Sequence, residues 1–257
     1  PNDDESKLSG ERLAADPNNA DRVFIGTVND GLWHTTDAGQ TWQHISALPH
    51  GQIDRGIRQI LFDVSAGTTN GATDYLYATV DSVGLYQSPD AGQTWQFITS
   101  SILNNTTEPH FLDGAIDAQG RVYLTGKDLT TNIPLFNVAI APNDPDHVVA
   151  LSEGFDETWR TTNALSPNPT WTSHGYARKA NQIGWMDFFA GAWFTIGEME
   201  FDPQHPGQLW IADGAATWQG KDLTAATWEW EENAAGQEHL VSNDLVVIGS
   251  GIPLTAH

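Results

Sequence analysis

Short apolar runs alternate with turn residues along most of the chain, in the pattern of β-strands and not of helices. The first group of runs lies at 10–18, 22–27, 31–34 and 41–45, with Gly, Pro, Asn or Asp between neighbouring runs. Runs of this length and spacing predict a four-stranded antiparallel unit. The 24 Gly and 13 Pro residues also favour strands and turns.

The same order of runs returns along the chain. A Gly- and Thr-rich stretch at 65–73 interrupts the second unit and is predicted to be a surface loop. Together the units predict an all-β fold, a single β-propeller domain or propeller fragment over 1–257, with about five to six four-stranded antiparallel blades. Because exposed sheet edges are unfavourable, we expect the chain to belong to a longer propeller or to close with strands from its two ends. The expected units lie at about 10–50, 51–105, 106–133, 134–180, 181–235 and 236–257.

One line of eight residues occurs twice, at 35–42 and 88–95, and both copies contain Asp-Ala-Gly-Gln-Thr-Trp. The aspartate can accept hydrogen bonds from the following backbone, and the glycine can adopt the positive φ of a tight turn. Each copy therefore predicts a hairpin turn followed by a tryptophan whose ring is buried as an anchor. A unique catalytic aspartate would not be expected at a repeated position. The structural residues of these turns are Asp37, Gly39, Trp42, Asp90, Gly92 and Trp95.

The composition narrows the choice of partners. There are 33 acidic and 11 basic residues, a net charge of −22, which argues against binding to the phosphates of nucleic acid. The charge indicates a solvated acidic surface, with a cation site or a basic partner as the alternative. The chain has no cysteine, and no apolar run is long enough to span a membrane. The polar start at 1–5 is typical of a mature or internal chain start and not of a signal peptide.

Candidate chemistry is limited to aromatic and carboxylate side chains. The nine histidines lack the spacing of a zinc site, and no EF-hand or phosphate loop is present, so no metal and no cofactor are predicted. The 11 tryptophans fit a β core, and some could serve as flat platforms for the apolar faces of sugar rings.

The repeated line is the Asp-box, or BNR repeat, which sialidases, sortilin-type receptors, photosystem assembly propellers and family 74 glycoside hydrolases share. Further segments resemble family 74 in order and approximate spacing, and together they cover most of 9–250. Two positions depart from the family pattern, Phe111 in place of a lysine and His239 in place of a glutamate. The matching segments are Gly-Glu-Arg-Leu-Ala with Asp-Pro-Asn at 10–18, Pro-His at 109–110, Gly-Trp-Met at 184–186 with Phe-Asp-Pro at 201–203, and Gly-Gln-Glu-His at 236–239 with Asn-Asp-Leu at 243–245.

The resemblance implies a secreted enzyme that cleaves xyloglucan or another β-glucan, with two seven-bladed propellers and the substrate in the cleft between them. Family 74 enzymes invert the anomeric centre with two aspartates, one acting as acid and one as base. Neither aspartate matches a position in this chain, so the resemblance implies a glycan-binding half of the cleft, with catalysis and a second propeller elsewhere in the parent chain.

The candidate substrate-binding residues come from the segments between the Asp-boxes. The stretch at 184–194 is glycine-flanked and aromatic, and it could line a cleft or form a packed plug between blades. Its tryptophans could stack on sugars, while charged residues and a histidine elsewhere could bond hydroxyls or could be ordinary surface and turn residues. The candidates are Trp185, Asp187, Trp193, Glu11, Arg12, His110 and Glu238.

Two other functions are compatible with the sequence. A non-catalytic Asp-box propeller could serve as a protein-binding or assembly module. A sialidase would need three arginines around the carboxylate of its substrate, although the Arg-Ile-Pro stretch of sialidases is missing. The arginines that could in principle supply such a triad are Arg12, Arg22, Arg55, Arg58, Arg121, Arg160 and Arg178.

Overall fold

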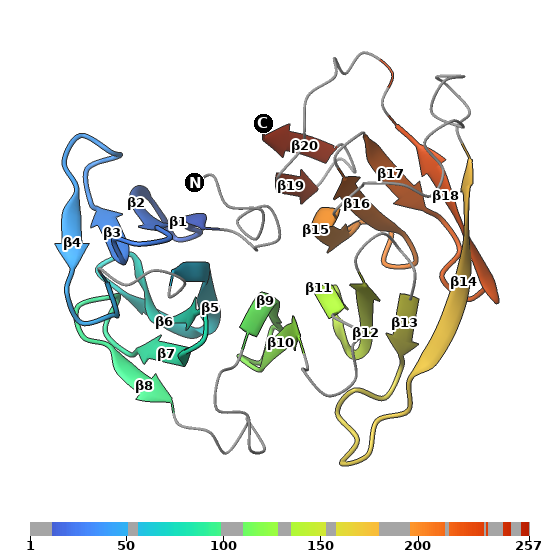
Figure 1. Ribbon diagram of the computed structural model, residues 1–257, viewed down its shortest axis with the longest axis horizontal. Helices are drawn as coiled ribbons and strands as arrows, with labels where there is room; N and C mark the ends of the chain where they lie inside the picture. Colours follow the sequence, from blue (N-terminus) through green and yellow to red (C-terminus); the bar gives the residue numbers. More distant parts are fainter. Residues whose placement is uncertain are drawn as a thin grey trace. The chain divides into compact units, whose positions relative to one another are not determined.

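The structure is a computed structural model, and every element that it describes is a β-strand (Figure 1). Within the described residues there is no helix long and apolar enough to cross a membrane. The chain divides into two compact units, Pro1–Ile133 and Pro134–His257, which are taken in turn. The described residues are 12–50, 56–98, 110–127, 135–152, 158–179, 196–213, 216–233, 235, 244–247 and 253–256.

The first unit opens with two antiparallel sheets of four strands, which confirms the predicted repeat. In both sheets the strands follow chain order, and the Asp-box turn joins the third strand to the fourth. The first sheet consists of β1 (Leu13–Asp16), β2 (Asn19–Gly26), β3 (Leu32–Thr35) and β4 (Gln43–Ile45). The second consists of β5 (Ile57–Thr69), β6 (Ala72–Val80), β7 (Gly84–Ser88) and β8 (Gln96–Ile98).

The prediction of a surface loop at 65–73 is wrong, because β5 and β6 continue through these residues as a hairpin. Thr69 pairs with Ala72 across a two-residue turn whose φ angles are 53° at Asn70 and 80° at Gly71. Positive φ at both central residues is the geometry that Asn-Gly favours, and it matches the twist of the flanking strands. Most of this hairpin is exposed, as a surface element should be.

The sheets of the first unit stack in series. Phe24 of the first sheet packs against Phe62 of the second, with ring centroids 5.8 Å apart, inside one hydrophobic cluster. The opposite side of the second sheet meets the next strand pair, since Gln59 Nε2 donates to Asp113 Oδ1 at 2.8 Å. That pair is β9 (His110–Ile116) and β10 (Val122–Lys127).

Buried charges link the first two sheets. Asp16 Oδ2 accepts from Arg22 Nη1 at 2.6 Å and from the Thr73 backbone N at 2.9 Å, so one carboxylate ties the end of β1 to β6. Arg22 Nη2 also donates to the carbonyl oxygen of Ala91 in the second Asp-box turn, at 2.5 Å. Both charged side chains are buried, where an ion pair needs such additional partners to offset its desolvation.

Within its described residues, the second unit has one sheet of eight strands and a separate strand pair, β19 (Asp244–Val247) with β20 (Pro253–Ala256). The strand order of the large sheet is β11-β12-β13-β14-β18-β17-β16-β15, which is two antiparallel sets of four joined at their last strands. The first set is β11 (Leu135–Ala141), β12 (Asp144–Ser152), β13 (Thr158–Thr161) and β14 (Thr172–Lys179). The second set is β15 (Ile196–Phe201), β16 (Leu209–Asp213), β17 (Thr217–Gly220) and β18 (Thr227–Glu232).

The joint between the two sets is a parallel pairing of β14 with β18, from Gly175 opposite Thr227 to Lys179 opposite Glu231. The His174 ring lies on the Trp228 ring with centroids 4.7 Å apart, which holds the start of the joint in register. Trp228 and Trp230 point to the opposite side of β18 from Thr227, into the hydrophobic core of this unit.

Candidate functional site

The two Asp-box turns have the same internal hydrogen bonds. Asp37 Oδ1 accepts from the Thr41 backbone N at 2.8 Å and Oδ2 accepts from Thr41 Oγ1 at 2.6 Å. Asp90 makes the matching bonds to Thr94 at 2.7 and 2.6 Å. The glycine two residues after each aspartate has a positive φ, 87° at Gly39. In both turns the carboxylate therefore stabilises its own turn through hydrogen bonds, as the motif predicts.

These bonds keep the aspartates ionised. Hydrogen bonds from Thr41, and then from Thr35, lower the pKa of Asp37 to about 2. Burial raises the pKa of Asp90, but hydrogen bonds from Thr94 and Ser88 outweigh burial and hold that pKa below its usual value. A general acid must hold a proton near the working pH, so neither group suits the acid step of glycoside hydrolysis.

Asn163 takes the place of the aspartate in a third turn of this kind. Its Oδ1 accepts from the Thr170 backbone N at 2.9 Å and from Thr161 Oγ1 at 2.9 Å. An uncharged oxygen therefore holds the turn in the same way, which indicates that the aspartate acts as a hydrogen-bond acceptor and not as a charge.

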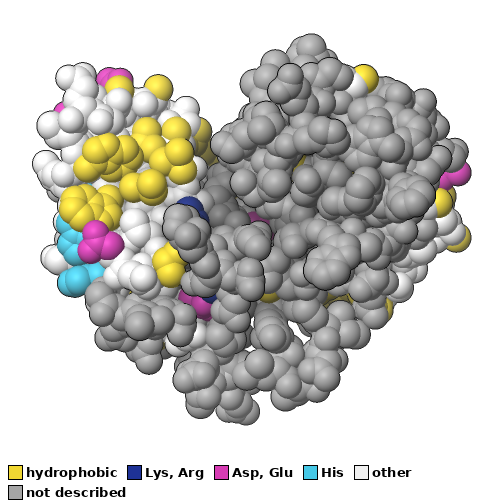
Figure 2. Space-filling model, turned by 45° about the horizontal axis from the view of Figure 1, so that its top comes forward, with side chains coloured by type: hydrophobic (Ala, Val, Ile, Leu, Met, Phe, Trp, Pro, Cys, Tyr) yellow, Lys and Arg dark blue, Asp and Glu magenta, His cyan; other side chains and the backbone are white. Residues whose placement is uncertain are grey.

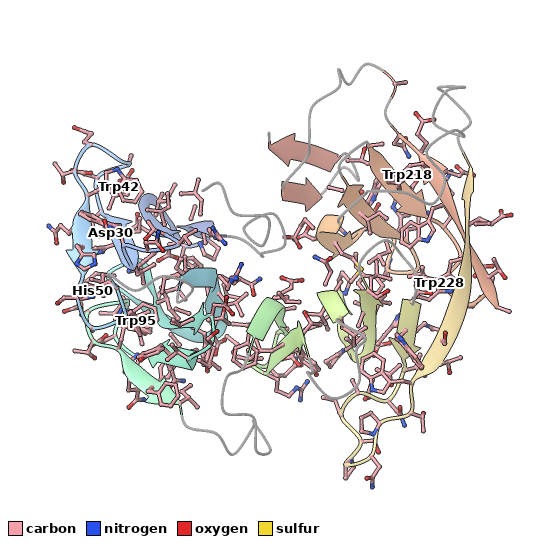
Figure 3. The ribbon with its side chains drawn as sticks, viewed as in Figure 1. Asp30, Trp42, His50, Trp95, Trp218 and Trp228 are labelled. Carbon is pink, nitrogen blue, oxygen red and sulfur yellow. The ribbon has the colours of Figure 1, made fainter. Side chains whose placement is uncertain are left out.

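The tryptophans of these turns are less buried than the sequence predicts. Trp42 is 38% exposed and Trp171 is 41% exposed, while Trp95 is half-buried and donates from Nε1 to the Gly92 carbonyl at 3.1 Å. Trp42 and Trp95 are labelled in Figure 3. The Trp42 ring lies against Gly39 of its own turn, whereas the Trp95 ring packs against the hydrophobic cluster that the first two sheets share.

The sequence-predicted substrate residues are mostly outside the described residues. Trp185, Asp187, Trp193, Glu11 and Glu238 fall in segments that the structure does not describe, and for His110 only the backbone, at the start of β9, is described. Arg12 is half-buried, and its carbonyl oxygen accepts from the Gly26 backbone N at 2.6 Å. Their assignment to glycan binding stays a prediction.

A different aromatic group lies at the end of the first sheet opposite its Asp-box turn. Trp33 Nε1 donates to Asp30 Oδ2 at 3.1 Å, and the Trp33 ring centroid lies 5.1 Å from that of His44. The His44 and His50 rings meet edge-on at 4.8 Å. Figure 2 shows histidine and acidic side chains beside hydrophobic ones on this unit, and Figure 3 labels Asp30 and His50.

The sequence pattern does not reveal this aromatic group, because Gly31-Leu32-Trp33 belongs to the repeated units and its contacts with His44 arise only when the strands pair. Indole, imidazole and carboxylate groups can bind a sugar, but this group borders aliphatic residues on the same sheet face, including Leu13 and Ile25. Such a composition is more typical of a protein interface than of a sugar platform.

Three arginines of the first unit are each paired with a different aspartate. Arg22 pairs with Asp16, Arg58 with Asp81, and Arg121 with Asp117. In the second unit, Arg160 Nε donates to His147 Nε2 at 2.8 Å. A sialidase needs guanidinium groups that converge on one substrate carboxylate. These four arginines bind different partners within the protein, which disfavours a sialidase site built from them.

The second unit has a groove of about 330 Å³ beside β18. Lys221 and Glu231 form an ion pair there, and the strand alternation also directs Thr227 and Glu229 into the groove. Across the described part of the chain, no group of three or more His, Asp or Glu side chains is placed to hold a metal ion.

Comparison with known proteins identifies relatives for this arrangement, although no family model matches the chain. A xyloglucanase of Paenibacillus sp is 27% identical over 226 residues, and a xyloglucanase of Acetivibrio thermocellus is 31% identical over 134 residues. The family 74 enzyme of Niastella koreensis superposes on 96% of this chain with a TM-score of 0.66 and 23% identity. The chain is homologous to the family 74 xyloglucanases.

This family 74 homologue corresponds to only part of its relatives. The Paenibacillus match covers 81% of this chain but 19% of that enzyme, and the Acetivibrio match covers 46% of this chain and 15% of that enzyme. The superposition covers 41% of the Niastella chain, and at 23% sequence identity it supports only the similarity of fold. The two complete sheets of the first unit, with their Asp-box turns, accordingly have the architecture of propeller blades.

Proposed function

We propose that this chain is part of a xyloglucan-cleaving endo-β-1,4-glucanase and contributes one side of its glycan-binding cleft. The observation that carries the proposal is the alignment with the Paenibacillus xyloglucanase over 81% of the chain. In this proposal the chain forms about five to six blades of a seven-bladed propeller. A second propeller of the parent protein provides the other side of the cleft, and the polymeric substrate requires secretion.

The catalytic aspartates lie outside these 257 residues in this proposal. Inversion needs a protonated acid and a separate base on the two sides of the sugar. Asp37 and Asp90 are held ionised by their turns, which supports a structural role for both. The chain alone is therefore expected to bind the polymer without cleaving it.

Binding would use the residues that the family resemblance singles out. Trp185 and Trp193 would stack on the apolar faces of glucose rings, and Asp187 would accept hydrogen bonds from sugar hydroxyls. The other candidates, Glu11, Arg12, His110 and Glu238, would add polar contacts.

The test measures binding and cleavage side by side with xyloglucan, carboxymethyl cellulose and a sialoside. We expect binding to xyloglucan by calorimetry and no released reducing ends. The Trp185→Ala variant should bind about tenfold or more weakly, if stacking of a sugar ring on an indole contributes as much as the roughly 1–3 kcal/mol of base stacking on aromatic side chains. The control is Trp42→Ala, which removes an exposed tryptophan of an Asp-box turn. Absence of binding to any glucan would refute the proposal and favour a protein-binding module, while cleavage by the chain alone would contradict the placement of the catalytic aspartates.

A further inference from the structure

The tip of the hairpin between β5 and β6 carries the one Asn-Gly pair of the sequence, Asn70-Gly71. Both residues are exposed, as are all the residues from Val64 to the turn. Apart from its chain neighbours, no described residue lies within 4 Å of a Cβ placed on Gly71. The turn therefore presents an asparagine side chain and the following peptide bond to solvent.

The backbone nitrogen of Gly71 is not held by the strand pairing. Thr69 pairs with Ala72 across the two-residue turn. Among the described residues, no turn or loop hydrogen bond has the Gly71 N–H as its donor. Glycine also has no side chain to hinder approach to its nitrogen, and its backbone is the most permissive of any residue. This nitrogen is therefore available as a nucleophile once its proton is removed.

The tip of the hairpin can open while the sheet stays folded. The pairing of β5 with β6 shifts register between Asp63 and Thr68, and beyond that irregularity two pairs, Thr68–Thr73 and Thr69–Ala72, close the tip. Exposed segments with few buried contacts open locally at a small fraction of the global free energy of unfolding. The side-chain amide carbon of Asn70 can then reach the Gly71 nitrogen without loss of the fold.

We propose that Asn70 is a site of spontaneous deamidation in the folded protein. Hydroxide removes the proton of the Gly71 N–H, and the nitrogen attacks Cγ of Asn70. The new Cγ–N bond closes a succinimide ring as the Cγ–Nδ2 bond breaks, and Nδ2 leaves as ammonia with a proton taken from water. Water then opens the ring at Cγ, which gives aspartate, or at the main-chain carbonyl carbon, which gives isoaspartate. This reaction is independent of glycan binding.

The two products affect the hairpin differently. Aspartate followed by glycine fits the same two-residue turn, so that product keeps the hairpin. Isoaspartate adds a methylene group to the main chain between Thr69 and Ala72, and a two-residue turn does not accommodate it. The next residue, Thr73, donates from its backbone N and its Oγ1 to the Asp16 carboxylate of the first sheet, at 2.9 and 2.6 Å. Isoaspartate at residue 70 therefore loosens a link between the first two sheets.

Asn143 provides a matched comparison within the chain. It is exposed, lies in a two-residue turn between the paired residues Ala141 and Asp144, and has a φ of 63°, against 53° at Asn70. The residue after it is Asp144, whose side chain hinders approach to the nitrogen and whose negative charge opposes an anionic nitrogen beside it. Asn70 should therefore deamidate about tenfold or more faster than Asn143.

The first test follows the unmodified chain in a mildly alkaline buffer, with a peptide of residues 65–74 as the reference. We expect acidic forms in ion-exchange chromatography and peptide maps that place the new carboxylate at residue 70. The rate should lie within about tenfold of that of the peptide, because only the tip must open. A slower rate would show that the folded turn protects Asn70, and earlier conversion of Asn143 would show that the glycine nitrogen is not decisive; either result would overturn the proposal.

The second test uses variants that keep the turn. Gly-Gly and Asp-Gly both fit it, so Asn70→Gly and Asn70→Asp should leave the melting temperature nearly unchanged. The leading acidic form should be missing from the Asn70→Gly variant, and its persistence would overturn the assignment to Asn70. The isoaspartate form, once separated, should melt below the Asn70→Asp variant. Equal melting temperatures would overturn the effect proposed for the modification.

Discussion

At the scale of single residues, equivalent positions of the repeat have different surroundings. Gly39 and Gly92 both follow an Asp-box alanine and have φ angles of 87° and 80°. Among the described residues, a Cβ on Gly39 would meet only the Trp42 ring, at 3.9 Å, whereas a Cβ on Gly92 would lie 2.8 Å from the Phe24 ring. The second turn is therefore part of the contact between sheets, and the first is not.

These two glycines make a matched pair of variants. Gly39→Ala should cost about 1–2 kcal/mol, the penalty of placing an L-residue in the left-handed region. Gly92→Ala should cost that and a further roughly 1–3 kcal/mol, because Phe24 must move within a packed core. Urea unfolding of both variants measures the difference, and equal losses would contradict a role of the Gly92 turn in sheet packing.

His147 should make stability depend on pH. Burial, and then the nearby Arg160 guanidinium, lower the pKa of His147 from 6.5 to about 4. Below pH 6.5 the unfolded chain takes up a proton that the folded chain does not, so this contribution to stability is complete above 6.5 and is lost as the pH falls toward 4.

The His147→Gln variant keeps an acceptor for Arg160 and removes the titration. Its free energy of unfolding should fall less between pH 7 and pH 4.5 than that of the unmodified chain, when both are measured in urea. Parallel pH profiles would show that His147 does not titrate as described.

At the scale of elements, the sequence predicts the strands of the first two sheets well, because each of these apolar runs ends at a strong turn signal. The exceptions depend on information outside that pattern. Asn70-Gly71 is a hairpin turn signal, but the Gly- and Thr-rich residues around it are more typical of a loop than of strands. The joint of β14 and β18 pairs strands about 50 residues apart, and no local pattern specifies such a partner. The aromatic group at Trp33 likewise depends on pairing between strands, because the pairing of β3 with β4 places His44 opposite Trp33.

The hairpin turn can be tested with two glycines that differ in backbone conformation. Among the described residues, nothing lies within 4 Å of a Cβ at Gly71 or at Gly207, and of these two glycines only Gly71 has a positive φ, of 80°. Gly71→Ala should therefore lose about 1 kcal/mol through backbone strain alone, and Gly207→Ala should be neutral or slightly stabilising. Thermal unfolding compares the two, and equal melting temperatures would contradict the turn geometry.

The buried Asp16–Arg22 ion pair of the first sheet, which also bonds to the second sheet, should contribute much more to stability. Asp16→Ala leaves the buried Arg22 guanidinium without its carboxylate and the Thr73 backbone N without its acceptor, a loss of about 3–5 kcal/mol. Asp21→Ala on the exposed part of β2 is the control and should change stability by less than about 0.5 kcal/mol. A small effect of Asp16→Ala in chemical denaturation would mean that Asp16 does not link the sheets.

At the scale of the whole molecule, charge opposes the fold. A net charge of −22 on 257 residues produces repulsion that favours expanded states. Raising sodium chloride from about 0.02 to 0.5 M shortens the Debye length from roughly 20 to 4 Å and should raise the melting temperature at pH 7. An equal rise with a neutral osmolyte in place of salt would argue against charge screening as the cause.

The parallel joint of β14 and β18 also bears on how this protein can diverge. The outer strands of the first two sheets, β4 and β8, are each paired on one side within their sheets, so their turns can gain or lose residues independently. From Gly175 to Lys179, however, every residue of β14 has a fixed partner on β18, and a one-residue insertion in either strand would turn all following side chains to the other face. Length changes in the second unit should therefore accumulate in its turns, or occur in both strands together.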